Sequence, residues 1–258
     1  MPKIIIANWK MAPPSLQEAK KLFGETAKIK NLNDTEIVVA APFIYLELLI
    51  NLSKKSKIKL AAQDVLWENP PVGGGAYTGE ISPNMLKNLG VEYVIIGHSE
   101  RRQNLKETDE MINKKIIASV KAGLKVILCV GEPKRNSIKQ AKNYIKKQLE
   151  KDLKGIPNNY KLKTNQLIIA YEPVWAISTN KNAKPDTPEN ALQMTKFIKN
   201  FLKPKTYNLK PKVIYGGSVS SKNIEGFLRH EEIEGALVGG ASLTSDFVKI
   251  IKIAQKYS

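Results

Sequence analysis

The chain has 258 residues, of which 42% are hydrophobic, and its formal net charge is +17. This apolar content is enough for a sizeable core and excludes an intrinsically disordered chain. No apolar run is long enough to span a bilayer, which excludes a membrane-spanning protein, and the single cysteine, Cys129, excludes an intramolecular disulfide. A strand-like run, Lys3–Ala7, opens the sequence without a signal-peptide pattern, so we expect a protein of the reducing cytoplasm.

The positive charge has two interpretations. It would suit binding to nucleic acid, a membrane surface or an anionic substrate, or it would belong to a lysine-rich solvated surface. Only four of the 41 basic residues are arginines, and the lysines are spread along the chain without interleaved aromatic residues. We therefore expect neither a nucleic-acid nor a membrane partner, although the charge is compatible with modest steering of a dianionic substrate.

Short β-rich runs alternate with longer amphipathic stretches along the chain. The predicted strands, in chain order, are Lys3–Asn8, Glu36–Ala41, Ile58–Gln63, Val91–Gly97, Lys125–Val130, Gln166–Tyr171, Lys212–Tyr215 and Gly235–Val238. The helices predicted to follow them are Ser15–Lys30, Ile44–Lys54, Pro83–Leu89, Thr108–Ala122, Ile138–Leu153, Pro188–Leu202, Ser221–Leu228 and Ser245–Lys256.

These eight strand–helix units predict an α/β fold with parallel strand pairing. Their number and the length of the chain fit a closed (β/α)8 barrel, a TIM barrel, that forms a single domain over residues 1–258. An open, doubly wound sheet is the alternative. No linker or break in composition indicates a second domain.

Polar, charged and glycine residues follow the apolar runs at nearly every predicted strand end, where a barrel of this kind carries its active site. Ordinary turn chemistry explains some of the glycines. It does not easily explain why Lys10, His98 and Glu172 all fall at strand ends, where a barrel would bring them together.

His98 directly follows the apolar run Val94–Gly97, and Ser99 after it is placed to cap a short helix. A helix N-terminus directed at His98 would disfavour its charged form and leave the imidazole as a neutral donor. A single histidine is more often structural than catalytic. The other histidine, His230, lies in a polar run and is expected at the surface.

Glu172 follows the predicted strand Gln166–Tyr171 and would be a base, a metal ligand or half of an ion pair. No cluster with the spacing of metal ligands accompanies it, so we expect no metal. As a base it would need a dry pocket, for which the apolar stretch Pro173–Ile177 would form a roof. The polar stretch Ser178–Thr187 is predicted to be a functional loop.

Two glycine turns end the seventh and eighth strands. They are Gly216-Gly217-Ser218 and Gly239-Gly240. Backbone amides after these strands often bind phosphate in this fold, so the two turns together predict a phosphate site.

With these motifs in place, the chain resembles the triosephosphate isomerase family over nearly its whole length. The most specific motifs are Gly97–Arg102 and Ala170–Ile177, and the others are Asn8–Lys10, Ala76–Ser82, Cys129–Glu132, Tyr215–Val219 and Val238–Leu243. They occur in the order of the family.

The resemblance implies a cofactor-free interconversion of dihydroxyacetone phosphate and D-glyceraldehyde 3-phosphate, as in glycolysis and gluconeogenesis. Glu172 would be the base and neutral His98 the proton donor, a pairing for which this family is itself the standard example. Lys10 would stabilise negative charge on the enediolate and phosphate.

Further roles follow from the resemblance. Asn8 would orient the substrate and Lys10, while the amides of Ser178, Ser218, Gly239 and Gly240 would bind the phosphate. The remaining supporting residues would be Ser99, Glu100, Cys129, Ile177, Tyr215 and Leu237, with Ile177 and Leu237 forming an apolar clamp over Glu172. Ser99 and Glu100 also fit purely structural roles, as a helix cap and an ion-pair partner.

The chain departs from the family pattern in two loops. Ser178-Thr179-Asn180 replaces Gly-Thr-Gly in the family's lid and is followed by extra residues, so we hypothesise a working lid with altered closure kinetics. The loop Trp67–Gly75 is longer than usual. In the family it enters a neighbouring subunit, where Thr78 would complete the site, so we predict a homodimer. Asp64 replaces the commoner Asn without a functional explanation.

Two other functions compete with an isomerase. One is a non-catalytic anion- or nucleic-acid-binding protein, which the charge suggests and the set of Lys10, His98 and Glu172 disfavours. The other is a phosphate-binding barrel enzyme with different chemistry, which would not explain why the whole motif set matches.

Overall fold

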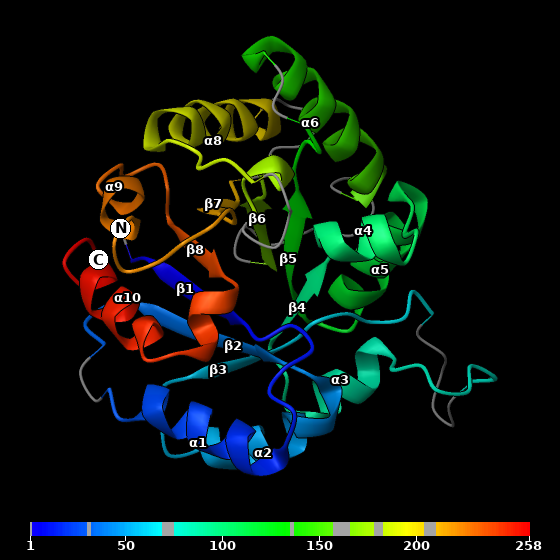
Figure 1. Ribbon diagram of the computed structural model, residues 1–258. Helices are drawn as coiled ribbons and strands as arrows, with labels where there is room; N and C mark the ends of the chain where they lie inside the picture. The colour runs from blue at the N-terminus through cyan, green and yellow to red at the C-terminus, as the bar shows by residue number, and fades with distance from the viewer. Residues whose placement is uncertain are drawn as a thin grey trace.

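The computed structural model describes residues 2–29, 32–68, 75–134, 137–156, 166–177, 183–203 and 210–258. Eight parallel strands close into a barrel in which each strand pairs with its neighbours in sequence and β1 pairs with β8 (Figure 1). The strands are β1 Ile4–Asn8, β2 Glu36–Ala41, β3 Lys59–Ala62, β4 Tyr93–Ile96, β5 Lys125–Val130, β6 Leu167–Tyr171, β7 Lys212–Tyr215 and β8 Gly235–Val238. The predicted (β/α)8 barrel is therefore confirmed, and the open sheet is excluded.

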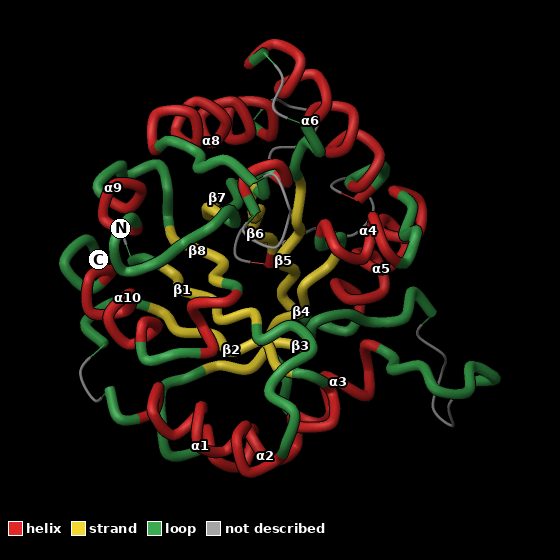
Figure 2. The backbone as a smooth tube through the Cα atoms, in the orientation of Figure 1, coloured by secondary structure: helices red, strands yellow, loops and turns green. Residues whose placement is uncertain are grey.

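Helices surround the barrel as an outer ring, as the backbone tube shows (Figure 2). They are α1 Leu16–Ala27, α2 Phe43–Ser53, α3 Pro83–Leu89, α4 Ser99–Asn104, α5 Asp109–Lys121, α6 Ile138–Asp152, α8 Pro188–Leu202, α9 Ile224–Leu228 and α10 Asp246–Ala254. Two short 3₁₀ turns, η2 Val174–Ala176 and η3 Gly240–Leu243, follow β6 and β8. Within the described ranges, no helix combines the length and the apolar character needed to cross a membrane.

Alternation along the strands divides the core into two layers. Ile4 and Ile6 on β1 belong to the cluster inside the barrel, whereas Ile5 and Ala7 belong to the larger cluster between strands and helices. Successive side chains of a strand point to opposite faces, so a strand buried on both faces is apolar throughout. This explains why the interiors of the strands are hydrophobic, while the partly buried charged residues Glu36, Lys59 and Lys125 stand at strand ends.

Local side-chain hydrogen bonds determine where several helices begin. Ser15, Thr108 and Thr187 each accept a backbone N–H from the first turn of α1, α5 and α8, as expected of N-cap residues. The helix predicted from Ser221 instead begins at Ile224. The Asn223 side chain accepts the Ser220 amide at 2.8 Å, and this bond stabilises a turn in place of the first helical turn.

Candidate active site

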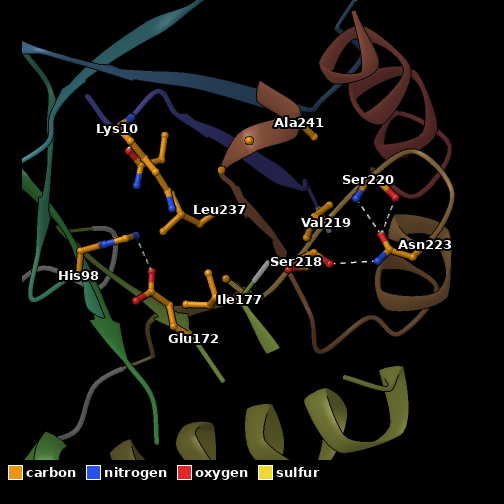
Figure 3. Close-up of a pocket in the computed structure, with 15 residues that line it drawn as sticks. Lys10, His98, Glu172, Ile177, Ser218, Val219, Ser220, Asn223, Leu237 and Ala241 are labelled. Carbon is orange, nitrogen blue, oxygen red and sulfur yellow. Dashed lines mark hydrogen bonds and ion pairs between the residues drawn. The ribbon is translucent and has the colours of Figure 1, made fainter. Parts of the chain in front are cut away.

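A pocket of about 270 Å³ lies at the carboxyl ends of the strands. Figure 3 shows side chains from opposite parts of the barrel directed into it, with His98 and Glu172 facing each other. Of the residues predicted for the site, those that line this pocket are Asn8, Lys10, His98, Glu172, Ile177, Ser218, Leu237, Gly239 and Gly240. The barrel thus brings together residues that are more than 200 positions apart in the sequence.

Glu172 follows β6 directly and is 2% exposed. Its Oε2 atom accepts the backbone N–H of Ser99 at 3.0 Å, and its Oε1 atom lies 3.3 Å from Nε2 of His98. Among the described residues, Oε1 has no hydrogen-bond partner of good geometry. A buried carboxylate with one oxygen directed into a pocket is suited to accept a proton from a bound molecule.

Two glycines enclose the backbone of Glu172. A Cβ atom on Gly131 would lie 1.6 Å from the Glu172 carbonyl oxygen, and one on Gly216 would lie 2.8 Å from its Cγ atom. The amide of Glu172 donates to the Val130 carbonyl at 2.8 Å. Strands β5 and β7 therefore approach Glu172 closely from both sides, which only glycine permits.

His98 is the N-cap residue of α4, which corrects the prediction that Ser99 caps this helix. The Nδ1 atom of His98 accepts the Glu100 amide at 3.3 Å, while Ser99 is the first helical residue and donates its own amide to Glu172. An imidazole whose Nδ1 accepts a hydrogen bond carries its proton on Nε2 when it is neutral. His98 thus presents an N–H donor to the pocket beside Glu172.

Lys10 reaches the pocket from the segment after β1. Its backbone has φ of 54°, in the left-handed region that non-glycine residues rarely adopt, and its amide donates to Oδ1 of Asn8 at 3.0 Å. Its ammonium pairs with the Glu100 carboxylate. This conformation, supported by Asn8, directs the Lys10 side chain toward Gly239, which follows the neighbouring strand β8.

The wall formed by the segments after β7 and β8 consists mainly of backbone. Gly217 packs against the side chain of Tyr215 at the end of β7, since a Cβ atom on Gly217 would be 2.2 Å from the Tyr215 hydroxyl. Gly240 is open, because a Cβ atom there would meet nothing within 4 Å. Ser218 donates its hydroxyl to the Ala176 carbonyl at 2.8 Å. The exposed backbone of this wall is suited to bind an anion through its N–H groups.

Four of the predicted supporting residues lie behind the pocket. Ser99 and Cys129 contact Glu172 from behind, Glu100 pairs with Lys10, and the Tyr215 ring stacks on Phe227 with centroids 4.0 Å apart. Burial raises the pKa of the Cys129 thiol well above its usual range, and the Glu172 charge adds to this, so the thiol remains protonated.

Some residues predicted for the site are not among those that line this pocket. Ser178, Thr179 and Asn180 lie outside the described residues, as does most of the loop Trp67–Gly75. Thr78 is exposed and does not line the pocket of its own chain. In the described part of the chain, no group of three or more His, Cys, Asp or Glu side chains is arranged to hold a metal ion.

Two residues that support the site act through their neighbours and are not evident from the sequence. Arg102 donates to the Gly97 carbonyl at 2.8 Å and to Asp152 at 2.6 Å, which fixes the residue before His98. Asn223 donates to the Ser218 carbonyl at 3.0 Å and supports the turn after β7. The only signal for Arg102 was its place at the end of the motif Gly97–Arg102, because its partner Asp152 is 50 residues away.

Glu132 anchors the start of the segment that covers Glu172. Its Oε1 atom accepts Nε1–H of Trp175 at 2.7 Å and the Tyr171 hydroxyl at 3.0 Å. Burial raises the pKa of the Glu132 carboxyl despite these donors. The bond to Trp175 fixes η2, which leads directly into Ile177.

Comparison with known proteins gives a consistent assignment. The family described as "Triosephosphate isomerase" matches residues 3–254. A protein named "Triosephosphate isomerase" from Caldanaerobacter subterraneus subsp. tengcongensis is 45% identical over 96% of this chain and 98% of its own. Proteins of the same name from Dictyoglomus turgidum and Geotalea uraniireducens are 43% and 40% identical, over 93% and 98% of this chain and 94% and 98% of their own. The fold, the pocket and these matches agree, and the chain belongs to the triosephosphate isomerase family.

Proposed function

We propose that this isomerase interconverts dihydroxyacetone phosphate and D-glyceraldehyde 3-phosphate, and that it serves glycolysis and gluconeogenesis in the cytoplasm. The observation that carries the proposal is the pair formed by the Glu172 carboxylate and Nε2 of His98, which are 3.3 Å apart in the pocket. A base and a neutral donor at this separation can reach a carbon-bound proton and the neighbouring carbonyl oxygen of one small molecule. The names of the relatives identify the substrate class.

In this mechanism Glu172 removes a proton from the carbon next to the carbonyl group. The C–H electron pair forms the C–C double bond of an enediolate, and the charge that develops on the carbonyl oxygen is stabilised by Nε2–H of His98 and by the Lys10 ammonium. His98 then moves protons between the two oxygens. Glu172 returns its proton to the neighbouring carbon, which completes the isomerisation without a cofactor.

The phosphate group binds at the wall formed by the segments after β7 and β8. The amides of Ser218, Gly239 and Gly240 donate to its oxygens, and Ser178, outside the described residues, contributes a fourth amide. Asn8 orients Lys10, and Ile177 and Leu237 shield Glu172 from water. In a dry site, the electrostatic interactions with the developing charge are stronger than in water.

The active enzyme is a homodimer in which Thr78 completes the site of the neighbouring subunit. Support comes from Met11, Ile44, Tyr77 and Met85, which are large, apolar and exposed. They follow β1, β2 and β3, three adjacent strands, and therefore lie on one side of the barrel. Light scattering should give twice the subunit mass of 28.8 kDa, and a mass of one subunit would exclude the dimer.

A coupled assay of triose phosphate isomerisation tests the activity. The parent should turn over both substrates, and Glu172→Asp should lower kcat by about 100-fold or more, because the shorter side chain withdraws the carboxylate from the reacting proton. Unchanged turnover in Glu172→Asp would remove Glu172 from its role as base. An inactive, correctly folded parent would refute the proposed function.

A further inference from the structure

The position of Glu172 depends on the segment made of the last residue of β5, Val130, and the residue after it, Gly131. The Glu172 amide donates to the Val130 carbonyl at 2.8 Å, and Gly131 packs so closely that a Cβ atom on it would lie 1.6 Å from the Glu172 carbonyl oxygen. Any shift of residues 130 and 131 would therefore move the backbone that carries the carboxylate.

Gln148 holds this segment from the outer ring. It lies on α6, is 5% exposed, and accepts the Gly131 amide through Oε1 at 3.0 Å, in a buried hydrogen bond. Gly131 has no side chain with which to anchor itself. The bond from Gln148 thus connects α6 to the segment against which Glu172 packs.

The packing around this region is incomplete on the side that faces α4 and α6. A second cavity, of about 180 Å³, lies behind the pocket and is lined by both Gln148 and Glu172, together with Ser99 and Cys129. Around a hollow of this size, neighbouring groups have few atoms to resist a displacement. Without the hydrogen bond from Gln148, residues 130, 131 and 172 would still be joined by the bond between the Val130 carbonyl and the Glu172 amide, and they would be free to move together toward the cavity.

We propose that Gln148 is a positioning residue for the base: its hydrogen bond to Gly131 sets the backbone of Glu172 and thereby the distance from the carboxylate to the substrate. This inference rests on the proposed function of Glu172. Gln148 touches no reacting atom. Its effect arises because proton transfer is sensitive to small displacements of the base.

Gln148→Met tests the proposal, because methionine has a similar length and no comparable acceptor. We expect kcat to fall by about 10-fold or more while KM stays within about twofold of the parent. Gln148→Asn, which withdraws the amide by one methylene group, should give a smaller fall in kcat. Gln148→Glu keeps an acceptor oxygen at the same reach and should recover most of the turnover.

Two control variants lie on the same helix. Lys147→Met places the same new side chain on the exposed face and should leave kcat unchanged. Ile145→Val removes buried packing from α6 without touching Gly131. It should lower the thermal midpoint but not kcat, which separates loss of stability from displacement of the base.

Parental kcat in Gln148→Met, or a fall in kcat that Ile145→Val reproduces, would overturn the proposal. A crystal structure of Gln148→Met provides a test that does not depend on activity. We expect the backbone of residues 130, 131 and 172 to move toward the cavity, and an unmoved backbone would overturn the inference. An inactive parent would count against the proposed function, whereas this structural comparison would still decide the role of Gln148.

Discussion

The side of the pocket formed by β4 to β6 differs from the side formed by β7 and β8. On the first side, His98 and Glu172 are buried side chains held by hydrogen bonds from Glu100 and Ser99. On the second side, Gly239 and Gly240 present backbone. Proton transfer needs a base and a donor in a fixed geometry, whereas an anion needs several N–H donors around it. The expected consequence is that changes on the first side affect kcat and changes on the second side affect KM.

The largest effect is expected from a matched pair of glycine substitutions. Gly131→Ala would place a methyl group 1.6 Å from the Glu172 carbonyl oxygen, so we expect loss of folding or of all measurable turnover. Gly240→Ala has open space around the new methyl group, so it should fold normally and raise KM by crowding the phosphate. Thermal unfolding measures the stability of the two variants, and steady-state kinetics measures their kcat and KM. A folded Gly131→Ala with parental kcat would contradict the comparison.

His98→Asn removes the ring while keeping a residue that caps helices well. We expect kcat to fall by about 10²- to 10⁴-fold, the usual contribution of a general acid or base, with little change in KM or in the thermal midpoint. Stopped assays at saturating substrate, with circular dichroism as a control for folding, would measure this. A rise in KM at constant kcat would instead place His98 in binding.

The smallest effect is expected from the contact between Ser221 and Asp246, which supports the side of the pocket formed by β7 and β8. The Asp246 carboxylate accepts the Ser221 hydroxyl at 2.5 Å and the Ser221 amide at 2.9 Å, and these two bonds lower the pKa of Asp246. A carboxyl whose pKa is lowered in the folded state stabilises the fold above its unfolded pKa, and this contribution is lost as the pH falls through the folded pKa.

Ser221→Ala removes the hydroxyl bond, the larger cause of the shift. The pKa of Asp246 should therefore move up toward its ordinary value, and the loss of stability that Asp246 contributes on acidification should become smaller. NMR titration of the Asp246 carboxyl carbon measures this shift. The kcat should stay parental, and an unchanged pKa would show that the backbone bond alone is sufficient.

Sequence patterns predicted the parts of the site that come directly after a strand. Lys10, His98 and Glu172 each follow an apolar run, and the closed barrel brings such positions to one end. Helix starts were predictable where one residue decides them, as with Thr187 before α8. The start of α9 was not, because the Asn223 side chain bonds backward to Ser220 in a local competition that periodicity does not reveal.

The sequence by itself determined the order of strands and helices, the family, and which residues stand at the strand ends, since these depend on local periodicity and motifs. Only the tertiary structure decided which of these residues face one another and what holds them. His98 caps its own helix, Gly131 lies against Glu172, and Gln148 reaches Gly131 from a helix in the outer ring. Contacts of this kind join residues that are distant in the chain, and they arise only when the closed barrel brings its segments together.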